Sequence, residues 1–162
     1  MQDFPRVLKH VTAWLVLATA VFLGVQAWQA ERARPAPRQM DGELVLRRAA
    51  DGHYHWPATV AGQSVDFLID TGATGSALPA ELAERLGLPR GDTIQTHTAA
   101  GPARGWISHA ELRLSHGPVL PEHRFMVLPG LGTPLLGMDV LSRLRLVQQG
   151  QELRISQPAR TP

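Results

Sequence analysis

The stretch VDFLIDTGA, residues 65–73, decides how the rest of this chain is interpreted. Residues 65–69 are mostly β-branched, aromatic or aliphatic, which is typical of a buried strand. Asp70 follows directly, and Gly72 allows the backbone to turn tightly and to approach another segment closely. The Thr71 hydroxyl can stabilise such a turn by local hydrogen bonds. The stretch therefore predicts a carboxylate presented at the end of a buried strand.

The distribution of charge argues against a nucleic-acid partner. The chain of 162 residues has a net charge of +2 and a sequence pI near 9.9. Five of its 16 Lys and Arg residues lie in residues 1–40, with two of its 14 Asp and Glu residues. The remaining part is therefore close to neutral, with no basic cluster of the kind that binds phosphates. The chain has no Cys, which excludes disulfides, zinc–thiolate sites and thiol nucleophiles.

An apolar segment near the N-terminus predicts a single membrane anchor. As a helix, residues 7–28 would span about 30 Å, the thickness of the hydrocarbon layer. Trp14 and Trp28 lie near its two ends, where indole rings favour the bilayer interface. A cleaved signal peptide is the alternative, with residues 25–27 as a small-residue cleavage site. Basic residues flank both ends, so the charges leave the orientation open.

Beyond residue 41, short strands separated by Gly and Pro favour a mainly β domain. We expect strands at residues 43–48, 53–60, 65–69, 94–98, 105–114, 124–128, 135–136, 145–147 and 153–155, with a hairpin turn at Gly62-Gln63. Two short helices are expected at residues 79–86 and 138–144. The expected organisation is an anchor or signal peptide with a short tail in residues 1–28, a stiff polar linker in 29–40, a folded domain in 41–157 and a tail in 158–162.

Three segments, in this order, resemble the retropepsin-like aspartic proteases, and specifically their membrane-anchored bacterial members. They are FLIDTGAT at residues 67–74, the helix region at 78–88 and PLLGMDVL at 134–141. The resemblance covers about residues 52–155. It implies a closed β-barrel of the acid-protease type with two short helices.

The resemblance also implies the roles of individual residues. Asp70 matches the catalytic aspartate, Thr71 the residue whose hydroxyl joins the two active-site loops, and Gly72 the close-approach glycine. The supporting residues of the active-site loops are Ala73, Leu135, Leu136 and Gly137. In the family, the motif of two apolar residues and a Gly threads beside the Asp-Thr-Gly loop.

A hairpin rich in small residues matches the flap, which covers a bound peptide in the family. Its residues are Ala99, Ala100, Gly101 and Pro102. Trp106 follows this hairpin and is a candidate substrate contact, but we favour core or cross-strand packing, which is usual for an aromatic residue in a strand. A loop tip with little to bury moves easily and suits a lid.

A lone carboxylate requires a partner for peptide hydrolysis. One group must take a proton from water and another must donate one, and two carboxylates about 3 Å apart do both by sharing a proton. The chain has one Asp-Thr-Gly and about half the length of a two-lobed aspartic protease, so we expect the partner to be Asp70 of a second copy. The predicted activity is an aspartic endopeptidase acting on polypeptides as a homodimer, without a cofactor. The alternative is a noncatalytic retropepsin-like module for dimerisation or peptide binding.

The resemblance implies a bacterial inner-membrane protein with a periplasmic domain.

Other candidate residues have structural alternatives. Asp139 is either a second acid or, as we favour, a carboxylate that stabilises the start of a helix. His53 and His55 share one face of a strand, as a metal pair would, but no further ligands follow at a recognisable spacing, so we expect no metal. Ser76 and Ser108 lack the support of a serine-hydrolase triad.

Overall fold

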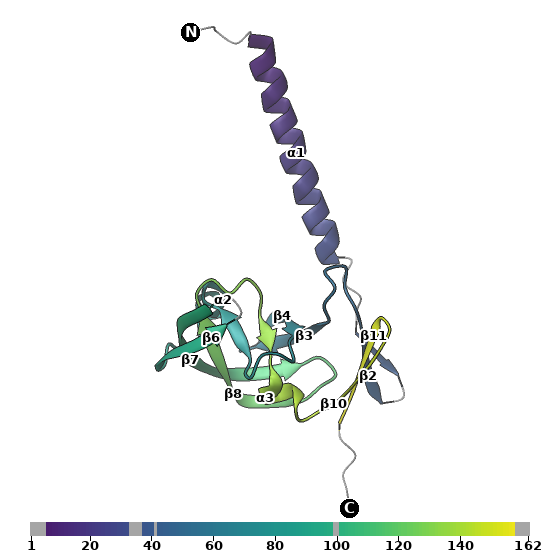
Figure 1. Ribbon diagram of the computed structural model, residues 1–162, viewed down its shortest axis with the longest axis vertical. Coiled ribbons are helices and arrows are strands. Elements are labelled where there is room, and N and C mark those ends of the chain that lie inside the picture. Colours follow the sequence, from purple (N-terminus) through teal and green to yellow (C-terminus); the bar gives the residue numbers. More distant parts are fainter. Residues whose placement is uncertain (1–5, 33–36, 41, 99–100, 158–162) are drawn as a thin grey trace, which may run out of the picture. The chain divides into compact units, whose positions relative to one another are not determined.

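The computed structural model describes residues 6–32, 37–40, 42–98 and 101–157. The chain divides into two compact units, Met1–Arg34 and Pro35–Pro162. Figure 1 traces the elements of both units along the chain.

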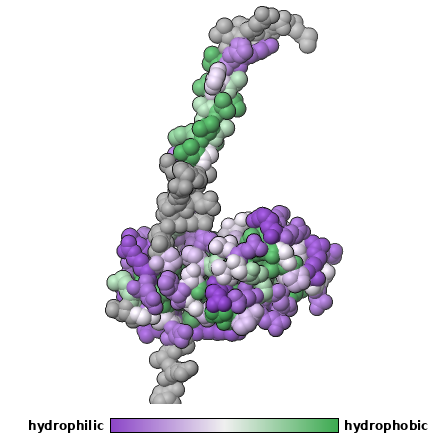
Figure 2. Space-filling model, turned by 180° about the vertical axis from the view of Figure 1, so that it is seen from behind, coloured by the Kyte–Doolittle hydropathy of each residue, from purple (hydrophilic) through white to green (hydrophobic). Residues whose placement is uncertain are grey.

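The first unit contains one helix, α1 (Arg6–Arg32). Its segment Lys9–Gln26 has a mean hydropathy of 1.3 and is long and apolar enough to cross a membrane. Large apolar side chains of this segment are exposed, including Trp14 at 70%, and Figure 2 shows them along the visible side of the helix. A signal sequence near the N-terminus can meet the same criteria of length and hydropathy, so the helix agrees with both interpretations of the N-terminus.

The second unit is built on a sheet that closes on itself. Its strands run in the order β3 (His55–Val60), β4 (Gln63–Ile69), β9 (Leu135–Leu136), β5 (Ala77–Pro79), β8 (Val119–Leu128), β7 (Gly101–Leu114) and β6 (Thr93–Thr98). Because β3 also pairs with β7, the strands from β3 to β7 form a closed barrel, and β6 lies outside it as the partner of β7. The expected mainly β, barrel-like fold is therefore confirmed.

The barrel core follows from alternation along the strands. In β3, Trp56, Ala58 and Val60 are buried while the residues between them are less so. Phe67 of β4 is fully buried and stacks on Phe125 of β8, with ring centroids 6.1 Å apart. Each such side chain contributes about 1.5–3 kcal/mol through burial. The strand that leads to Asp70 is thus fixed by its inward face.

A tight turn joins β3 to β4. Ala61 and Gly62 both have positive φ, +48° and +79°, as a two-residue hairpin loop with matching twist requires. The turn lies one residue earlier than the expected Gly62-Gln63.

A second, smaller sheet has the order β1 (Arg38–Met40), β2 (Glu43–Arg47), β11 (Glu152–Ser156), β10 (Arg145–Gln149). β1 is an antiparallel edge strand within the segment that we expected to be a linker, and α1 continues through Arg32 at the other end of that segment. The sequence of β1 is polar because an edge strand needs only backbone pairing on one side.

The two short helices differ slightly from the expectation. The first, α2 (Ala80–Arg85), begins after Pro79 and is followed by Gly87 at φ +67°. The second, α3 (Met138–Leu141), ends earlier than the expected residue 144, and Arg143 and Leu144 continue it only as a turn. The strand β5 was not expected, because three residues are too few for a visible alternation.

Candidate active site

Backbone hydrogen bonds on both edges of β4 hold the end of this strand, directly before Asp70. Ile69 donates its N–H to the carbonyl of Tyr54 at 2.9 Å. Asp70 donates its N–H to the carbonyl of Leu136 at 3.0 Å, which continues the parallel pairing of β4 with β9. The position of Asp70 is therefore fixed by the sheet on either side.

The Asp70 side chain lies over an exposed turn. Its Oδ1 accepts the N–H of Gly72 at 2.8 Å, and its carbonyl accepts the N–H of Ala73 at 3.2 Å. A Cβ atom at Gly72 would lie 3.1 Å from Oδ1, closer than nine in ten real contacts. Thr71 and Gly72 are exposed, and Asp70 makes no ion pair with any residue that the structure describes. One carboxylate oxygen is thus oriented by the loop, and Asp70 itself is partly exposed to solvent.

The segment between β9 and α3 lies directly beside this loop. Met138 donates its N–H to the carbonyl of Ala73 at 2.8 Å. Gly137 is buried, and a Cβ atom there would lie 2.5 Å from the carbonyl carbon of Gly75. The two backbones touch, so only Gly fits. The structure therefore brings Leu135, Leu136 and Gly137 next to the Asp70 loop.

Asp139, in the first turn of α3, has both carboxylate oxygens occupied. Oδ2 accepts the backbone N–H of Ser76 at 3.0 Å, and Oδ1 accepts the Ser76 hydroxyl at 2.9 Å and the N–H of Val140 at 3.0 Å. His123 Nε2 lies 3.3 Å from Oδ2. Burial by itself would raise the pKa of Asp139, but His123 and the two Ser76 donors outweigh burial and lower this pKa below its ordinary value. The geometry favours a structural role, although the main partner is Ser76 rather than the free N–H groups at the start of the helix.

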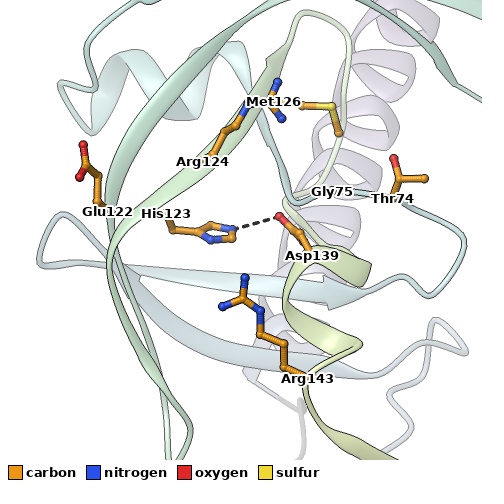
Figure 3. Close-up of a pocket in the computed structure, with 8 residues that line it drawn as sticks. All are labelled: Thr74, Gly75, Glu122, His123, Arg124, Met126, Asp139 and Arg143. Atoms are coloured by element: carbon orange, nitrogen blue, oxygen red, sulfur yellow. Dashed lines mark ion pairs between the residues drawn. The ribbon is translucent and has the colours of Figure 1, made fainter.

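A cavity of about 330 Å³ lies behind this contact. Figure 3 shows the His123 imidazole and the Asp139 carboxylate facing each other, with the Arg143 side chain directed toward them. The lining residues are Thr74, Gly75, Glu122, His123, Arg124, Met126, Asp139 and Arg143. Thr74 and Gly75 belong to the loop that follows Asp70, so this loop forms part of the cavity wall.

The expected flap is the hairpin of β6 and β7. Ala99 and Ala100, at its tip, lie outside the described residues. Gly101 has φ +111°, Pro102 is exposed, and the Thr98 hydroxyl donates to the Gly101 carbonyl at 2.9 Å. Trp106 is only 8% exposed and has the guanidinium carbon of Arg90 3.9 Å from its ring centre. Its burial favours the packing interpretation.

The two histidines considered as a metal pair contact aspartates instead. His55 Nε2 lies 2.8 Å from Asp51 Oδ2, and its Nδ1 lies 3.2 Å from Asp66 Oδ2. His53 Nδ1 lies 3.7 Å from Asp51 Oδ1. No cluster of three or more His, Asp or Glu suited to a metal ion is found in the described part of the chain.

Sequence reasoning missed the structural role of Ser76 and His123. Ser76 is fully buried; its hydroxyl donates to Asp139 and accepts the N–H of Gly137 at 3.2 Å, so it holds loops rather than acting as a nucleophile. The Ser108 hydroxyl donates to the Pro89 carbonyl at 2.6 Å. A Ser six residues after the Asp of the Asp-Thr-Gly stretch is close enough to contact the neighbouring segment, whereas nothing in the sequence around His123 indicates its partner.

Comparisons with known proteins support the family and the fold. The family described as "gag-polyprotein putative aspartyl protease" matches residues 56–143. An uncharacterized protein in the cobV 5' region of Sinorhizobium sp is 33% identical over 120 residues, which cover 70% of this chain and 51% of that protein. The Gag-Pol polyprotein of gibbon ape leukemia virus is 33% identical over 87 residues, covering 54% of this chain and 5% of the polyprotein.

A solved structure carries the same fold. The crystal structure of a retropepsin-like aspartic protease from Rickettsia conorii matches with a TM-score of 0.59 and 25% identity, covering 75% of this chain and 94% of that one. The chain spans about half the length, or less, of the curated relatives it matches. The chain therefore belongs to the gag-polyprotein aspartyl protease family and has the fold of the retropepsin-like aspartic proteases.

Proposed function

We propose that this chain is an aspartic endopeptidase whose active site is a pair of Asp70 carboxylates contributed by two copies. The observation that carries the proposal is the state of the Asp70 side chain. It lies at a strand end held by the Leu136 carbonyl, it is oriented by the Gly72 N–H at 2.8 Å, and it is partly exposed to solvent. Such a carboxylate suits proton exchange with a water molecule.

A second copy is the source of the second acid because the neighbouring carboxylate in the same chain is committed elsewhere. Both oxygens of Asp139 accept hydrogen bonds from Ser76 or Val140, and His123 lies against one of them. Asp139 therefore has no free oxygen for a shared proton. Two Asp70 groups related by a two-fold axis meet the requirement for equivalent partners.

In this mechanism the two Asp70 carboxylates share one proton, because two like charges about 3 Å apart do not both ionise. The ionised group takes a proton from water as the water attacks the scissile carbonyl carbon. The protonated group donates its proton toward the carbonyl oxygen, and a tetrahedral species forms. Proton transfer to the amide nitrogen then releases the amine and restores the shared proton. Thr71, Gly72 and Ala73 hold the loop, and Gly101, Pro102 and the rest of the flap hairpin cover an extended polypeptide.

We further propose that α1 anchors the enzyme as a single membrane span, with the folded unit on the periplasmic side of a bacterial inner membrane. The support is the 18-residue apolar segment, whose side chains are wholly unburied in its own unit. Confinement to a membrane raises the effective concentration of the chains and assists a weak dimer.

A mixing experiment tests the shared active site. Full-length chain in detergent is assayed on an unfolded protein substrate, alone and with increasing amounts of Asp70→Asn chain. We expect activity to fall as mixed dimers form, because each then holds one Asp70. The same excess of Asp92→Asn, a matched change at an exposed aspartate, should raise the activity in proportion to the chain added, because every dimer then keeps two Asp70 groups.

Two outcomes contradict the proposal. If the wild-type chain leaves the substrate whole between pH 3 and 7, the noncatalytic dimerisation or peptide-binding module becomes the better assignment. If the wild-type chain cleaves but sediments as a monomer and is insensitive to the Asp70→Asn chain, the shared pair is wrong.

A further inference from the structure

His123 lies at the end of a chain of contacts that leads to the catalytic loop. Its Nε2 atom is 3.3 Å from Asp139 Oδ2, and Asp139 binds both the N–H and the hydroxyl of Ser76. Along the chain, Ser76 lies 63 residues before Asp139 but only six residues after Asp70. The imidazole is therefore connected to this loop through two side chains, those of Asp139 and Ser76.

The contact between His123 and Asp139 is supported by packing around the imidazole. The His123 side chain is only 10% exposed, and its ring meets the edge of Phe125 with centroids 4.7 Å apart and planes at 82°. Phe125 in turn stacks on Phe67 of β4, the strand that ends at Asp70. The imidazole is thus held both by packing on Phe125 and by its contact with the Asp139 carboxylate.

The surroundings leave Asp139 as the group that His123 faces. From β8 itself, Glu122 and Arg124 line the cavity, and Arg143 enters it from the segment after α3. From β7, the residues opposite His123 and Arg124 are Ala110 and His109, and His109 is exposed. Figure 3 shows Arg124 directed away from the His123 ring and Arg143 directed toward it. The other carboxylate that lines the cavity, Glu122, points away from the imidazole in Figure 3.

We infer that His123 is a positioning residue for the Asp70 loop, keeping Asp139 ionised so that Ser76, and with it the loop from Asp70 to Gly75, stays in its working conformation. This inference rests on the proposed proteolytic function. An ionised carboxylate accepts hydrogen bonds at both oxygens, as Ser76 requires, whereas a protonated one carries a hydrogen on one of them. Aspartic dyads need one protonated member, so the loop must hold its shape under acidic conditions.

The direction of the pH effect follows from the same contacts. His123 and Ser76 together lower the pKa of Asp139 against the opposing effect of burial. Removing the imidazole removes one lowering contribution, so Asp139 becomes protonated at a higher pH than in the wild-type chain. The Ser76 contact then fails within the acidic range in which the dyad works.

The test compares His123→Leu, His123→Gln and the control His109→Leu in the full-length chain. For His123→Leu we expect kcat to fall roughly ten- to a hundredfold at acidic pH with little change in KM, because the loop geometry rather than substrate contact is disturbed. The acidic limb of the kcat profile should move to higher pH. Gln keeps an N–H donor near the Nε2 position, so His123→Gln should restore most of kcat, and His109→Leu should behave as wild type.

A structural readout separates this inference from the proposed function. Hydrogen exchange at the Ser76 amide and the NMR titration of the Asp139 carboxyl carbon are measured in the Asp70→Asn background, where no cleavage occurs. We expect His123→Leu to speed exchange at Ser76 and to move the Asp139 titration to higher pH. An unchanged titration and unchanged exchange would overturn the positioning role. A wild-type chain without protease activity would overturn the proposed function instead.

Discussion

Asp70 lies in the turn after β4 and Asp139 in the first turn of α3, and the two carboxylates have different hydrogen-bond partners. Asp70 has one carboxylate oxygen held by the N–H of Gly72, within its own turn, and is partly exposed to solvent. Asp139, which is half-buried like Asp70, accepts hydrogen bonds at both oxygens. A carboxylate that exchanges protons needs a free oxygen, whereas one that joins two loops uses every lone pair it can. The environment, not the residue type, separates the two roles.

The largest expected effect comes from Asp70→Asn. The proposed mechanism predicts a loss of roughly 10²–10⁴-fold or more in kcat, because Asn neither takes nor gives the required proton. The free energy of unfolding should change by no more than about 0.5 kcal/mol, since the Asn oxygen still accepts the Gly72 N–H. Peptide cleavage and urea denaturation followed by tryptophan fluorescence measure the two quantities. Full cleavage by this variant would remove Asp70 from the mechanism.

Gly137→Ala breaks the contact between the loops without touching either carboxylate. The added Cβ atom would lie 2.5 Å from the Gly75 carbonyl carbon and 3.0 Å from the Ala73 oxygen. We expect a loss of about 3 kcal/mol or more in the free energy of unfolding, because backbone must move. Gly132→Ala is the control, since a Cβ atom there meets nothing within 4 Å. Equal stability of the two variants would mean that the loops are not in close contact.

Asp139→Ala removes the acceptor from a buried serine. The Ser76 N–H and hydroxyl lose their partner, and an unsatisfied buried donor costs about 1–3 kcal/mol. Urea denaturation at pH 7 should show a loss in this range, whereas Asp92→Ala at an exposed site should show none. A neutral result for Asp139→Ala would contradict the loop-joining role.

The smallest expected effect is the pH dependence of the stabilisation that Asp139 provides through its hydrogen bonds with Ser76. The pKa of Asp139 lies below its ordinary value of 3.8 in the folded chain. The stabilisation is therefore fully present above pH 3.8 and is lost as the pH falls through the folded-state pKa. The difference in unfolding free energy between wild type and Asp139→Ala should be largest near neutral pH and should shrink in strong acid. A difference that grows on acidification would reverse the assigned sign.

Much of the fold was predictable because its signals are local. Alternation along residues 55–60 and the stretch ending at Asp70 indicate strands, and Pro79 and Gly87 bound a short helix. The edge strand β1 and the three-residue β5 were not predictable, because each is defined by the strand it pairs with rather than by its own pattern.

The candidate site divides in the same way. The Asp-Thr-Gly turn and the Leu-Leu-Gly segment could be identified as partners through the resemblance, and the structure brings them together at the Met138–Ala73 hydrogen bond. Packing of Trp106 was among the expectations, but its partners, Arg90 and the α2 residues, could not be predicted, because the sequence does not state which face of β7 meets α2.

The sequence by itself determined that Asp70 is presented at the end of a buried strand, since strand, turn and glycine are encoded within nine consecutive residues. Only the tertiary structure decided what Asp139 does. Its partners, Ser76 and His123, lie 63 and 16 residues away along the chain and meet it only once the barrel has closed. A carboxylate acquires its protonation and its role from its neighbours, and those neighbours are a property of the fold.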